Sequence, residues 1–505
     1  MDVSWAIDVK VDTNLLLGIG GLIIALVAFV LSRRAEKLVG IPVMTGCGSD
    51  HEKAMMEGTL KYPITPFVVE TQRLFVIIST CCYEEFKNIS QDKATFWEIQ
   101  KKEMGAEFTK IFQHNDAVTL ALRADLNQNL AGTLSQVEEK ISWVFEKELG
   151  HSEDWQIFRL HEFVVLIVAR LVAGVFVAPR FTRDDEWTNL SLGLAVNLVL
   201  ARDSIKRWPT LLQPLAGPFL PEIRTVNRQI SRMAEMLKPV INSLLETSAT
   251  TRPLHNDKRK ALEAEDGEDA GTKSSMSFAS INTTTNALTF IVLDLAARPE
   301  YTQPLRDEIE EVIKQNNVEE DKDGVLRFKQ SSLTKLWKLD SFMKESSRLS
   351  KNPISILRMV MKPITLSTGH RLPKGTRFAF GARAVQMSPQ SQAYSPNYNP
   401  PENKPPHEFD GFRFYRLRKM AGKENKHLFV TVSPESLTWG YGNHACPGRF
   451  FADTELKVLL IELLRKWNFR VADPTKTNSE SLRKMRELFV VVPKSAEVEM
   501  RRRKM

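Results

Sequence analysis

Residues 439–449 read Trp439-Gly440-Tyr441-Gly442-Asn443-His444-Ala445-Cys446-Pro447-Gly448-Arg449, and a helical pattern follows directly. The first two glycines permit tight turns and Pro447-Gly448 bends the chain again, so Cys446 is expected on a constrained loop. From Leu456 to Trp467, apolar side chains recur at the spacing of three and four that is typical of an amphipathic helix. Unpaired amides and the positive end of a helix dipole favour a thiolate there. The pattern therefore indicates that Cys446 is an anionic ligand.

This stretch resembles the haem-binding loop of the cytochrome P-450 family, Phe-x-x-Gly-x-x-x-Cys-x-Gly. Gly442, Cys446 and Gly448 match the pattern, and Trp439 stands where phenylalanine is usual. The resemblance implies that the Cys446 thiolate is the axial ligand of the iron of haem b, with the Trp439 ring beside the haem. It also suggests His444 as a donor to a haem propionate. The other interpretations are a small buried hydrophobe for Cys446 and a hydrogen-bonded turn residue for His444.

Composition indicates a large globular protein, because 43% of the 505 residues are apolar. The formal charge of +8 comes without dense basic blocks interleaved with aromatic residues. This argues against nucleic acid as a partner and fits membrane lipid or an acidic protein. Four cysteines are too few for a disulfide framework, so the main domain is expected in a reducing, cytosolic compartment. The adjacent Cys81 and Cys82 are interpreted as packing residues.

An uncharged apolar run extends from Leu15 to Leu31, at the lower length limit for a helix that spans a bilayer. Acidic residues precede the run, unlike a signal peptide, and the basic Arg33-Arg34 pair follows it. A single-pass membrane anchor with its C-terminal side in the cytosol is therefore predicted; a buried core helix is the alternative. We predict an anchor and hinge at residues 1–40, a main domain at 41–505, and a location in the endoplasmic reticulum membrane.

The main domain is predicted to be mainly α-helical with a small β region, the fold that the resemblance implies. Apolar residues recur mostly at helical spacing between residues 44 and 247, and the apolar segment from Phe163 to Val175 predicts a buried helix. Two apolar runs, Ile356 to Leu366 and Thr376 to Phe380, predict a β-hairpin. The charge-rich residues 251–275 predict a solvated surface loop.

A helix is expected from Met276 to Ala297, where Pro299 stops it. It resembles the family's oxygen-binding helix, whose pattern is Ala/Gly-Gly-x-Asp/Glu-Thr-Thr/Ser. Three residues match this pattern: Ala279, Thr283 and Thr284. Ser280 and Asn282 replace the glycine and the acid, which leaves proton relay to water and an amide.

Thr283 is the catalytic residue that this resemblance implies. Its hydroxyl would relay protons to the reacting oxygen. The other interpretation of successive threonines is that their hydroxyls bond to carbonyls one turn earlier. We expect the hydroxyls of Thr284 and Thr285 to form this bond to the carbonyls one turn earlier.

Glu345 and Arg348 lie one helical turn apart and resemble the family's Glu-x-x-Arg signature. The resemblance implies a buried, structural ion pair with Arg413 as its third partner. A surface pair at this spacing, worth roughly 0.2 to 0.5 kcal/mol, is the alternative.

The resemblance places the substrate between two segments without ionisable side chains, Asn352 to Leu357 and Ser277 to Ile281. Their large apolar residues are Ile354, Ile356, Leu357, Phe278 and Ile281. Apolar walls favour a lipophilic substrate. The sequences at 123–126 and 358–366 resemble the fungal branch that oxidises terpenoids and other secondary metabolites. A terpenoid-type substrate is therefore predicted, with a polyketide or a prenylated alkaloid as the alternative.

The predicted function is a haem-thiolate monooxygenase that uses O2. Its electrons would come from an NADPH–cytochrome P-450 reductase, because the chain has no flavin or nicotinamide fingerprint. Four basic residues are predicted to form the docking patch: Arg449, Lys457, Arg465 and Lys466. For the last two, a solvated helix face is the alternative. One alternative is rearrangement or dehydration without external electrons, which Ser280 and Asn282 favour. A non-catalytic haem-binding module is another, and Thr283 argues against it.

Overall fold

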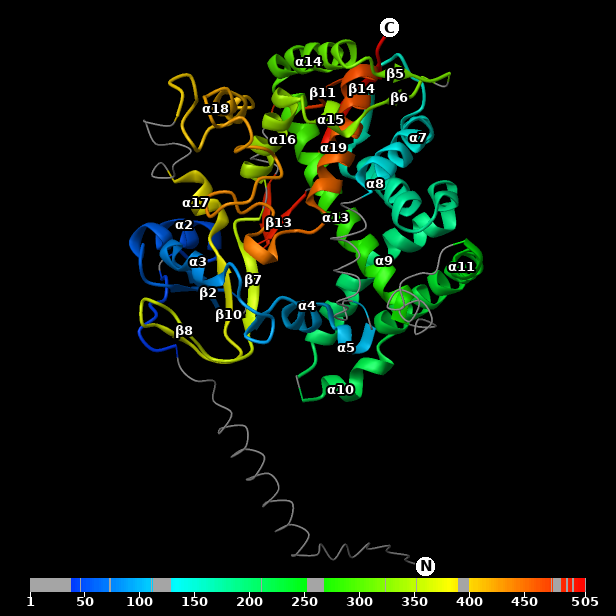
Figure 1. The fold of residues 1–505 in the computed structure, drawn as a ribbon. Coiled ribbons are helices and arrows are strands. Elements are labelled where there is room, and N and C mark those ends of the chain that lie inside the picture. Colours follow the sequence, from blue (N-terminus) through cyan, green and yellow to red (C-terminus); the bar gives the residue numbers. More distant parts are fainter. Residues whose placement is uncertain are drawn as a thin grey trace, which may run out of the picture.

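Figure 1 shows the fold in a computed structural model of the chain. The structure describes residues 38–45, 47–71, 74–109, 111, 129–209, 211–251, 268–322, 324–350, 352–388, 399–473, 475, 483–486, 489–492 and 495–504. The predicted anchor at 15–31 lies outside these ranges, as do residues 123–126 and most of the predicted loop at 251–275. Within the described ranges, no helix has the length and apolar character needed to cross a membrane.

Helices dominate the described chain. The long ones are α2 (His51–Lys61), α7 (Leu130–Leu149), α8 (Leu160–Phe176), α9 (Asp185–Lys206), α11 (Pro221–Thr251), α13 (Glu268–Ala297), α14 (Thr302–Gln315), α16 (Trp337–Ser350) and α19 (Arg449–Lys466). The short ones are α3 (Tyr83–Phe86), α4 (Trp97–Met104), α5 (Ala106–Thr109), α10 (Gln213–Ala216), α15 (Gln330–Leu333), α17 (Ala382–Met387) and α18 (Arg413–Arg418). The predicted buried helix is confirmed as α8. The helix predicted from Met276 ends at Ala297 as expected but begins earlier, at Glu268.

Local chemistry fixes several of these helix ends. The Asp184 carboxylate accepts from the Trp187 amide at 2.9 Å and begins α9. The Asp50 carboxylate does the same for the Lys53 amide at the start of α2, also at 2.9 Å. Such side chains satisfy amides that have no partner within the helix.

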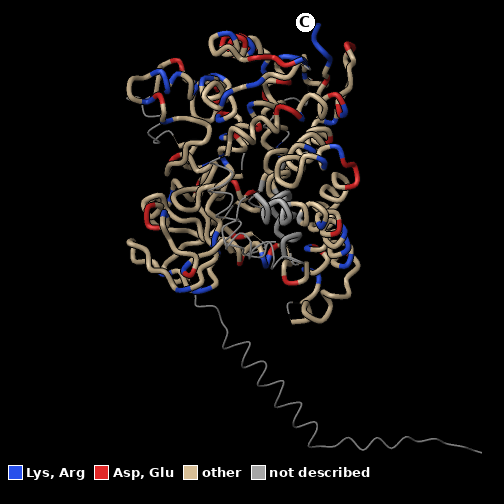
Figure 2. Tube along the Cα trace, turned by 45° about the vertical axis from the view of Figure 1, so that its right-hand side comes forward, with Lys and Arg blue, Asp and Glu red and all other residues tan. Residues whose placement is uncertain are grey.

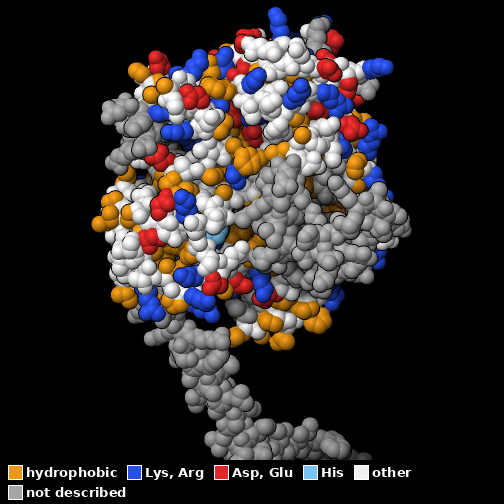
Figure 3. All heavy atoms as spheres, in the orientation of Figure 1, with side chains coloured by type: hydrophobic (Ala, Val, Ile, Leu, Met, Phe, Trp, Pro, Cys, Tyr) orange, Lys and Arg blue, Asp and Glu red, His pale blue; other side chains and the backbone are white. Residues whose placement is uncertain are grey.

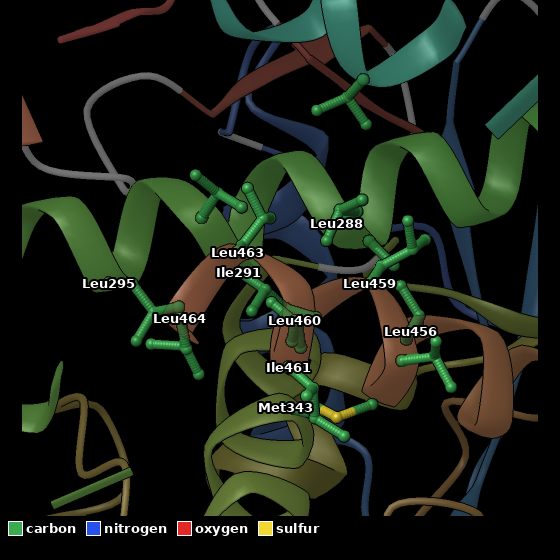
Figure 4. Close-up of a cluster of buried hydrophobic side chains, with 14 of the residues drawn as sticks. Leu288, Ile291, Leu295, Met343, Leu456, Leu459, Leu460, Ile461, Leu463 and Leu464 are labelled. Atoms are coloured by element: carbon green, nitrogen blue, oxygen red, sulfur yellow. The ribbon is translucent and has the colours of Figure 1, made fainter. Parts of the chain in front are cut away.

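α13 runs through the helical part of the molecule and packs against α8, α16 and α19 (Figure 1). Leucine and isoleucine are prominent in the core between these helices. Figure 4 shows Leu288, Ile291 and Leu295 of α13, Met343 of α16, and Leu456, Leu459, Leu460, Ile461, Leu463 and Leu464 of α19. The leucines of α19 recur at the predicted spacing of three and four. Each contributes roughly 1.5–3 kcal/mol on burial, so this core fixes α13 against α19.

The main sheet has five strands in the order β1-β2-β10-β7-β3. They are β1 (Phe67–Glu70), β2 (Leu74–Ile78), β3 (Ala94–Thr95), β7 (Ser355–Val360) and β10 (Arg377–Phe380). β2 and β10 are parallel, and the other pairs are antiparallel. The predicted hairpin is confirmed by the pairing of β7 with β10, where Arg377 lies opposite Met359.

The remaining strands form small sheets. β4 (Gln156–Arg159), β11 (Trp467–Val471) and β14 (Glu497–Arg502) make one in the order β11-β14-β4. Three pairs complete the set: β5 (Glu319–Glu320) with β6 (Leu326–Arg327), β8 (Ile364–Thr365) with β9 (Arg371–Leu372), and β12 (Lys484–Arg486) with β13 (Phe489–Val491). The prediction of a mainly α-helical fold with a small β region is confirmed.

Charged residues are distributed over the outer loops and helices. Figure 2 shows basic and acidic positions interspersed along the traced chain. Opposite charges form many surface ion pairs, such as Arg232 with Glu186 at 2.7 Å and Lys206 with Glu103 at 2.6 Å. The described surface therefore carries mixed charge.

Candidate active site

Cys446 lies on a loop whose backbone requires glycine at two positions. Gly440 has φ of +85° and Gly442 has φ of +59°, in the left-handed region that favours glycine. A Cβ atom at Gly440 would lie 2.7 Å from the His444 carbonyl oxygen, and one at Gly442 would collide with the backbone of Lys87. Both glycines are therefore needed for the loop conformation and for its close approach to the neighbouring chain.

Backbone hydrogen bonds close this loop and attach it to the segment after α3. The Cys446 amide donates to the Trp439 carbonyl at 2.7 Å, and the Asn443 amide donates to the Lys87 carbonyl at 3.0 Å. Cys446 itself is half-buried, and α19 begins just after it, with Gly448 as N-cap residue. The predicted arrangement of a constrained loop followed by a helix is confirmed.

Thr283 and Ala279 are exposed on one face of α13. The Thr283 hydroxyl donates to the Ala279 carbonyl at 2.8 Å, whereas Thr284 is buried and donates to the Glu455 carboxylate at 3.4 Å. The buried Thr285 hydroxyl has no hydrogen-bond partner in the described structure. The expectation for Thr284 and Thr285 was therefore wrong, because it is Thr283 that bonds one turn back.

Glu455 joins the helix of Thr283 to the helix that follows Cys446. Its carboxyl group is fully buried, and burial raises its pKa to about 8 even though the hydrogen bond from Thr284 lowers it. A neutral acid in this position can bond to Thr284 without the cost of a buried charge. Together with the leucine core, this contact sets the position of Thr283 relative to the cysteine loop.

Comparison with known proteins identifies the family. The cytochrome P-450 family model matches residues 109–500. The chain belongs to the cytochrome P-450 family. It is 35% identical to cytochrome P-450 monooxygenase ascG of Acremonium egyptiacum, over 96% of this chain and 95% of the relative. It is 32% identical to cytochrome P-450 monooxygenase 3 of Gibberella fujikuroi, over 84% of this chain and 83% of that relative. It is 30% identical to ent-kaurene oxidase of Gibberella intermedia, over 79% of this chain and 74% of that relative. The predicted family and its fungal branch are confirmed.

A cytochrome P-450 is a haem-thiolate monooxygenase whose haem iron has a cysteine thiolate as axial ligand. The described site fits this group. Cys446 presents a sulfur from a loop closed by backbone hydrogen bonds, and a Cβ atom placed on Gly448, two residues further on, would meet no atom within 4 Å. The predicted cofactor is thus consistent with the donor and with the space beside it.

Arg358 on β7 is a candidate site residue that the sequence analysis did not single out. It is half-buried, burial lowers the pKa of its guanidinium to about 10, and its Nη1 donates to the Leu357 carbonyl at 2.8 Å. It makes no ion pair with any residue in the described ranges. A cation in this position suits an anionic ligand such as a haem propionate. The sequence feature that could have indicated this residue is a single arginine within an otherwise apolar predicted strand.

The two proposed haem neighbours on the loop have protein partners. One ring nitrogen of His444, Nε2, lies 2.9 Å from the Ile89 carbonyl oxygen, a contact that helps to attach the loop. Trp439 is buried, and its Nε1 donates to the Phe429 carbonyl at 2.8 Å. The rings of Trp439 and Phe429 pack edge to face, with their centroids 5.2 Å apart. Trp439 thus has a fixed orientation next to the loop.

The predicted docking patch was wrong. Lys457 is buried, with its Nζ 2.8 Å from one Asp340 oxygen. Arg465 and Lys466 are mostly buried and are paired with Glu310 and Glu462, each at 2.8 Å. Arg449 donates to the Cys446 carbonyl at 3.0 Å. These cations stabilise the helix and loop and do not form a free basic surface.

Four of the five predicted substrate-facing residues lie in or beside apolar clusters, with Leu357 as a partly buried side chain, and their contact with substrate stays a prediction. Ile281 belongs to the helical core, and Ile354 and Ile356 pack into the two clusters around the main sheet. The side chain of Phe278 lies outside the described part of the chain. On the exposed face of α13 the described residues are small, Ala279 and Thr283.

The predicted structural ion pair is confirmed. Arg348 Nη2 lies 2.7 Å from a Glu345 oxygen, and Arg413 Nε lies 3.2 Å from the same oxygen. All three side chains are almost fully buried. The guanidinium groups also donate to carbonyls of residues 404–408, such as Arg413 to Lys404 at 2.6 Å. The cluster therefore ties α16 to the segment before the cysteine loop.

Proposed function

We propose that this cytochrome P-450 hydroxylates, or successively oxidises, a lipophilic terpenoid-type intermediate with O2 and electrons from an NADPH–cytochrome P-450 reductase. The observation that carries the proposal is the position of Cys446 on a glycine-dependent loop that leads into α19, which packs against α13, the helix that presents Thr283. One relative is named for the oxidation of ent-kaurene, a terpenoid hydrocarbon. We further propose Cys446 as the iron ligand and Trp439, His444 and Arg358 as haem neighbours.

When bound, the haem supplies oxygen activation, in which two electrons and two protons convert O2 and a C–H bond into an alcohol and water. The loop holds the Cys446 sulfur in place through its backbone bond to Trp439. Ala279 leaves space for substrate on the exposed face of α13. The Thr283 hydroxyl on the same face can pass a proton toward the reacting oxygen by exchanging its bond to the Ala279 carbonyl.

Binding titrations on the purified enzyme test the substrate class. Terpenoid skeletons are expected to shift the haem to high spin, and NADPH with reductase should then give oxygenated product. A high-spin shift with small charged aromatic compounds and none with terpenoids would contradict the proposal. Product formed without NADPH would instead indicate rearrangement or dehydration, and haem binding without any turnover would indicate a binding module.

Thr283→Ala is expected to lower the product formed per NADPH several-fold and to divert the remainder into hydrogen peroxide, because a proton donor on the substrate side is lost. Thr285→Ala is the matched control, since its hydroxyl is buried on the same helix. Peroxide and product are measured together in each variant. Equal coupling in wild type and both variants would remove Thr283 from the mechanism.

We also propose that the chain is attached to the endoplasmic reticulum membrane, with residues 1–40 as anchor and the main domain in the cytosol. A group of exposed apolar side chains between α9 and α11 supports lipid contact: Trp208, Leu211, Leu212, Leu215 and Phe219. Figure 3 shows hydrophobic side chains at the lower edge of the molecule, where Figure 1 places α10. Soluble domains rarely expose so many large apolar residues together.

Deletion of residues 1–37 should release much of the protein from microsomes while haem incorporation persists. Leu211→Ser with Leu215→Ser in the deleted chain should release the remainder, because the exposed apolar side chains are then removed. Protease added to intact microsomes should digest the main domain of the full chain. A protected domain would reverse the proposed orientation.

A further inference from the structure

A cluster of buried charges lies where α16, α18 and α19 meet. Asp340 of α16 is 2% exposed, and its Oδ1 lies 2.8 Å from the Nζ of Lys457, which is 3% exposed. Its Oδ2 lies 3.3 Å from the guanidinium of Arg418. Lys457 also reaches Asp453 at 2.9 Å. Asp340 is therefore the carboxylate that two buried cations share.

A chain of hydrogen bonds leads from this carboxylate to the cysteine loop. Asp340 Oδ2 accepts from the Phe429 amide at 2.9 Å. The Phe429 carbonyl accepts from the indole of Trp439 at 2.8 Å, and the Trp439 carbonyl accepts from the Cys446 amide at 2.7 Å. Each step is a bond of ordinary length between buried or half-buried groups.

The connection is closed by α19. This helix begins at Arg449, directly after the loop, and carries Lys457 two turns further along. Its Lys457 bonds to the same Asp340 that holds Phe429. Both sides of the cysteine loop are thus attached to one carboxylate, on one side through Trp439 and on the other through α19.

We propose that Asp340 is a positioning residue for the thiolate of Cys446, acting through Phe429 and the indole N–H of Trp439. The proposal rests on the assignment of Cys446 as the iron ligand. The link depends on this chain's tryptophan, because the phenylalanine found at that position in the family pattern has no donor. Groups that orient a metal ligand from outside the coordination shell tune the bond between ligand and metal.

Asp453 offers a matched control for Asp340. It is another buried carboxylate that bonds to Lys457, but within the described residues it makes no hydrogen bond to Phe429. Burial raises the pKa of its carboxyl group above the ordinary value. Asp453→Asn therefore perturbs the cluster while it leaves the hydrogen-bond path to the loop intact.

The test uses the reduced carbon-monoxide complex of the full-length holoenzyme, whose red-shifted Soret band requires an intact thiolate ligand. In Asp340→Asn, the rate at which this band converts to that of the thiolate-free form should be about tenfold higher than in wild type. Tenfold is the lower end of the effects of substituting groups that orient a metal ligand from outside the coordination shell. Asp453→Asn should convert at the wild-type rate. In a Trp439→Phe background, Asp340→Asn should have a smaller further effect, because the path through the indole is already broken and only the contact through α19 remains.

Equal acceleration by Asp340→Asn and Asp453→Asn, or the same effect of Asp340→Asn in both backgrounds, would show a merely structural role and overturn the proposal. Trp439→Phe alone keeps an aromatic ring, so it remains decisive if Asp340→Asn yields no holoenzyme. It should accelerate conversion, and an unchanged rate would overturn the proposal. A wild-type protein without the red-shifted band would instead contradict the assignment of Cys446 itself.

Discussion

Cys446→Ala is expected to abolish the red-shifted Soret band of the reduced carbon-monoxide complex, together with NADPH-driven oxygenation. The band reports a thiolate on the iron, and alanine supplies no ligand atom. The loop should keep its conformation, because the bond from residue 446 to the Trp439 carbonyl is a backbone bond and the two left-handed glycines remain. The loss should therefore be complete and specific to ligation.

Cys82→Ala provides the control for this substitution. Cys82 is buried, and burial raises its pKa to about 12, so it remains a neutral thiol and packs as a small apolar residue. Its removal should leave the red-shifted band in place. Persistence of the band in Cys446→Ala would show that another residue is the ligand.

The features that could be predicted from the sequence have strong local signals. The cysteine loop is specified by glycines whose conformation other residues adopt only with strain, and α19 is specified by leucines at helical spacing. The buried α8 follows from its continuous apolar sequence. In each case the information lies within about twenty residues of chain, because turns and amphipathic helices are set by local geometry.

The features that could not be predicted depend on partners far away in the sequence. Lys457 has Asp453 one turn before it, a spacing typical of a solvated helix face. It is buried because Asp340, 117 residues earlier, supplies a second carboxylate. In the same way, the hydroxyl of Thr284 bonds to Glu455, 171 residues later, and not to its own helix. Such pairings arise from helix packing, which one sequence does not reveal.

Arg358 shows the same limit for the haem site. Its strand is predictable, and a cation in an apolar strand requires an explanation. What the structure adds is that burial disfavours its charge and that no described carboxylate pairs with it. Only the packing of β7 in the sheet makes this residue a candidate haem neighbour.

Glu345→Gln is expected to destabilise the protein by about 3–5 kcal/mol, the usual cost of removing one partner from a buried ion pair. The Glu345 carboxylate is fully buried and accepts from Arg348 at 2.7 and 2.8 Å, from Arg413 at 3.2 Å and from the Asp410 amide at 2.9 Å. Glutamine keeps the size but removes the charge, so two buried guanidinium groups lose their carboxylate. Because the segment that leads to the cysteine loop is attached here, haem content should fall as well.

Glu162→Gln is the matched control, because Glu162 pairs with Arg159 at the same spacing of three residues but with both side chains more than half exposed. An exposed pair contributes only about 0–1 kcal/mol, since water and salt screen it. Urea unfolding and haem content measured on both variants should therefore differ sharply. Similar small losses in the two proteins would mean that Glu345 contributes no more than a surface charge, and the structural role assigned to its cluster would be wrong.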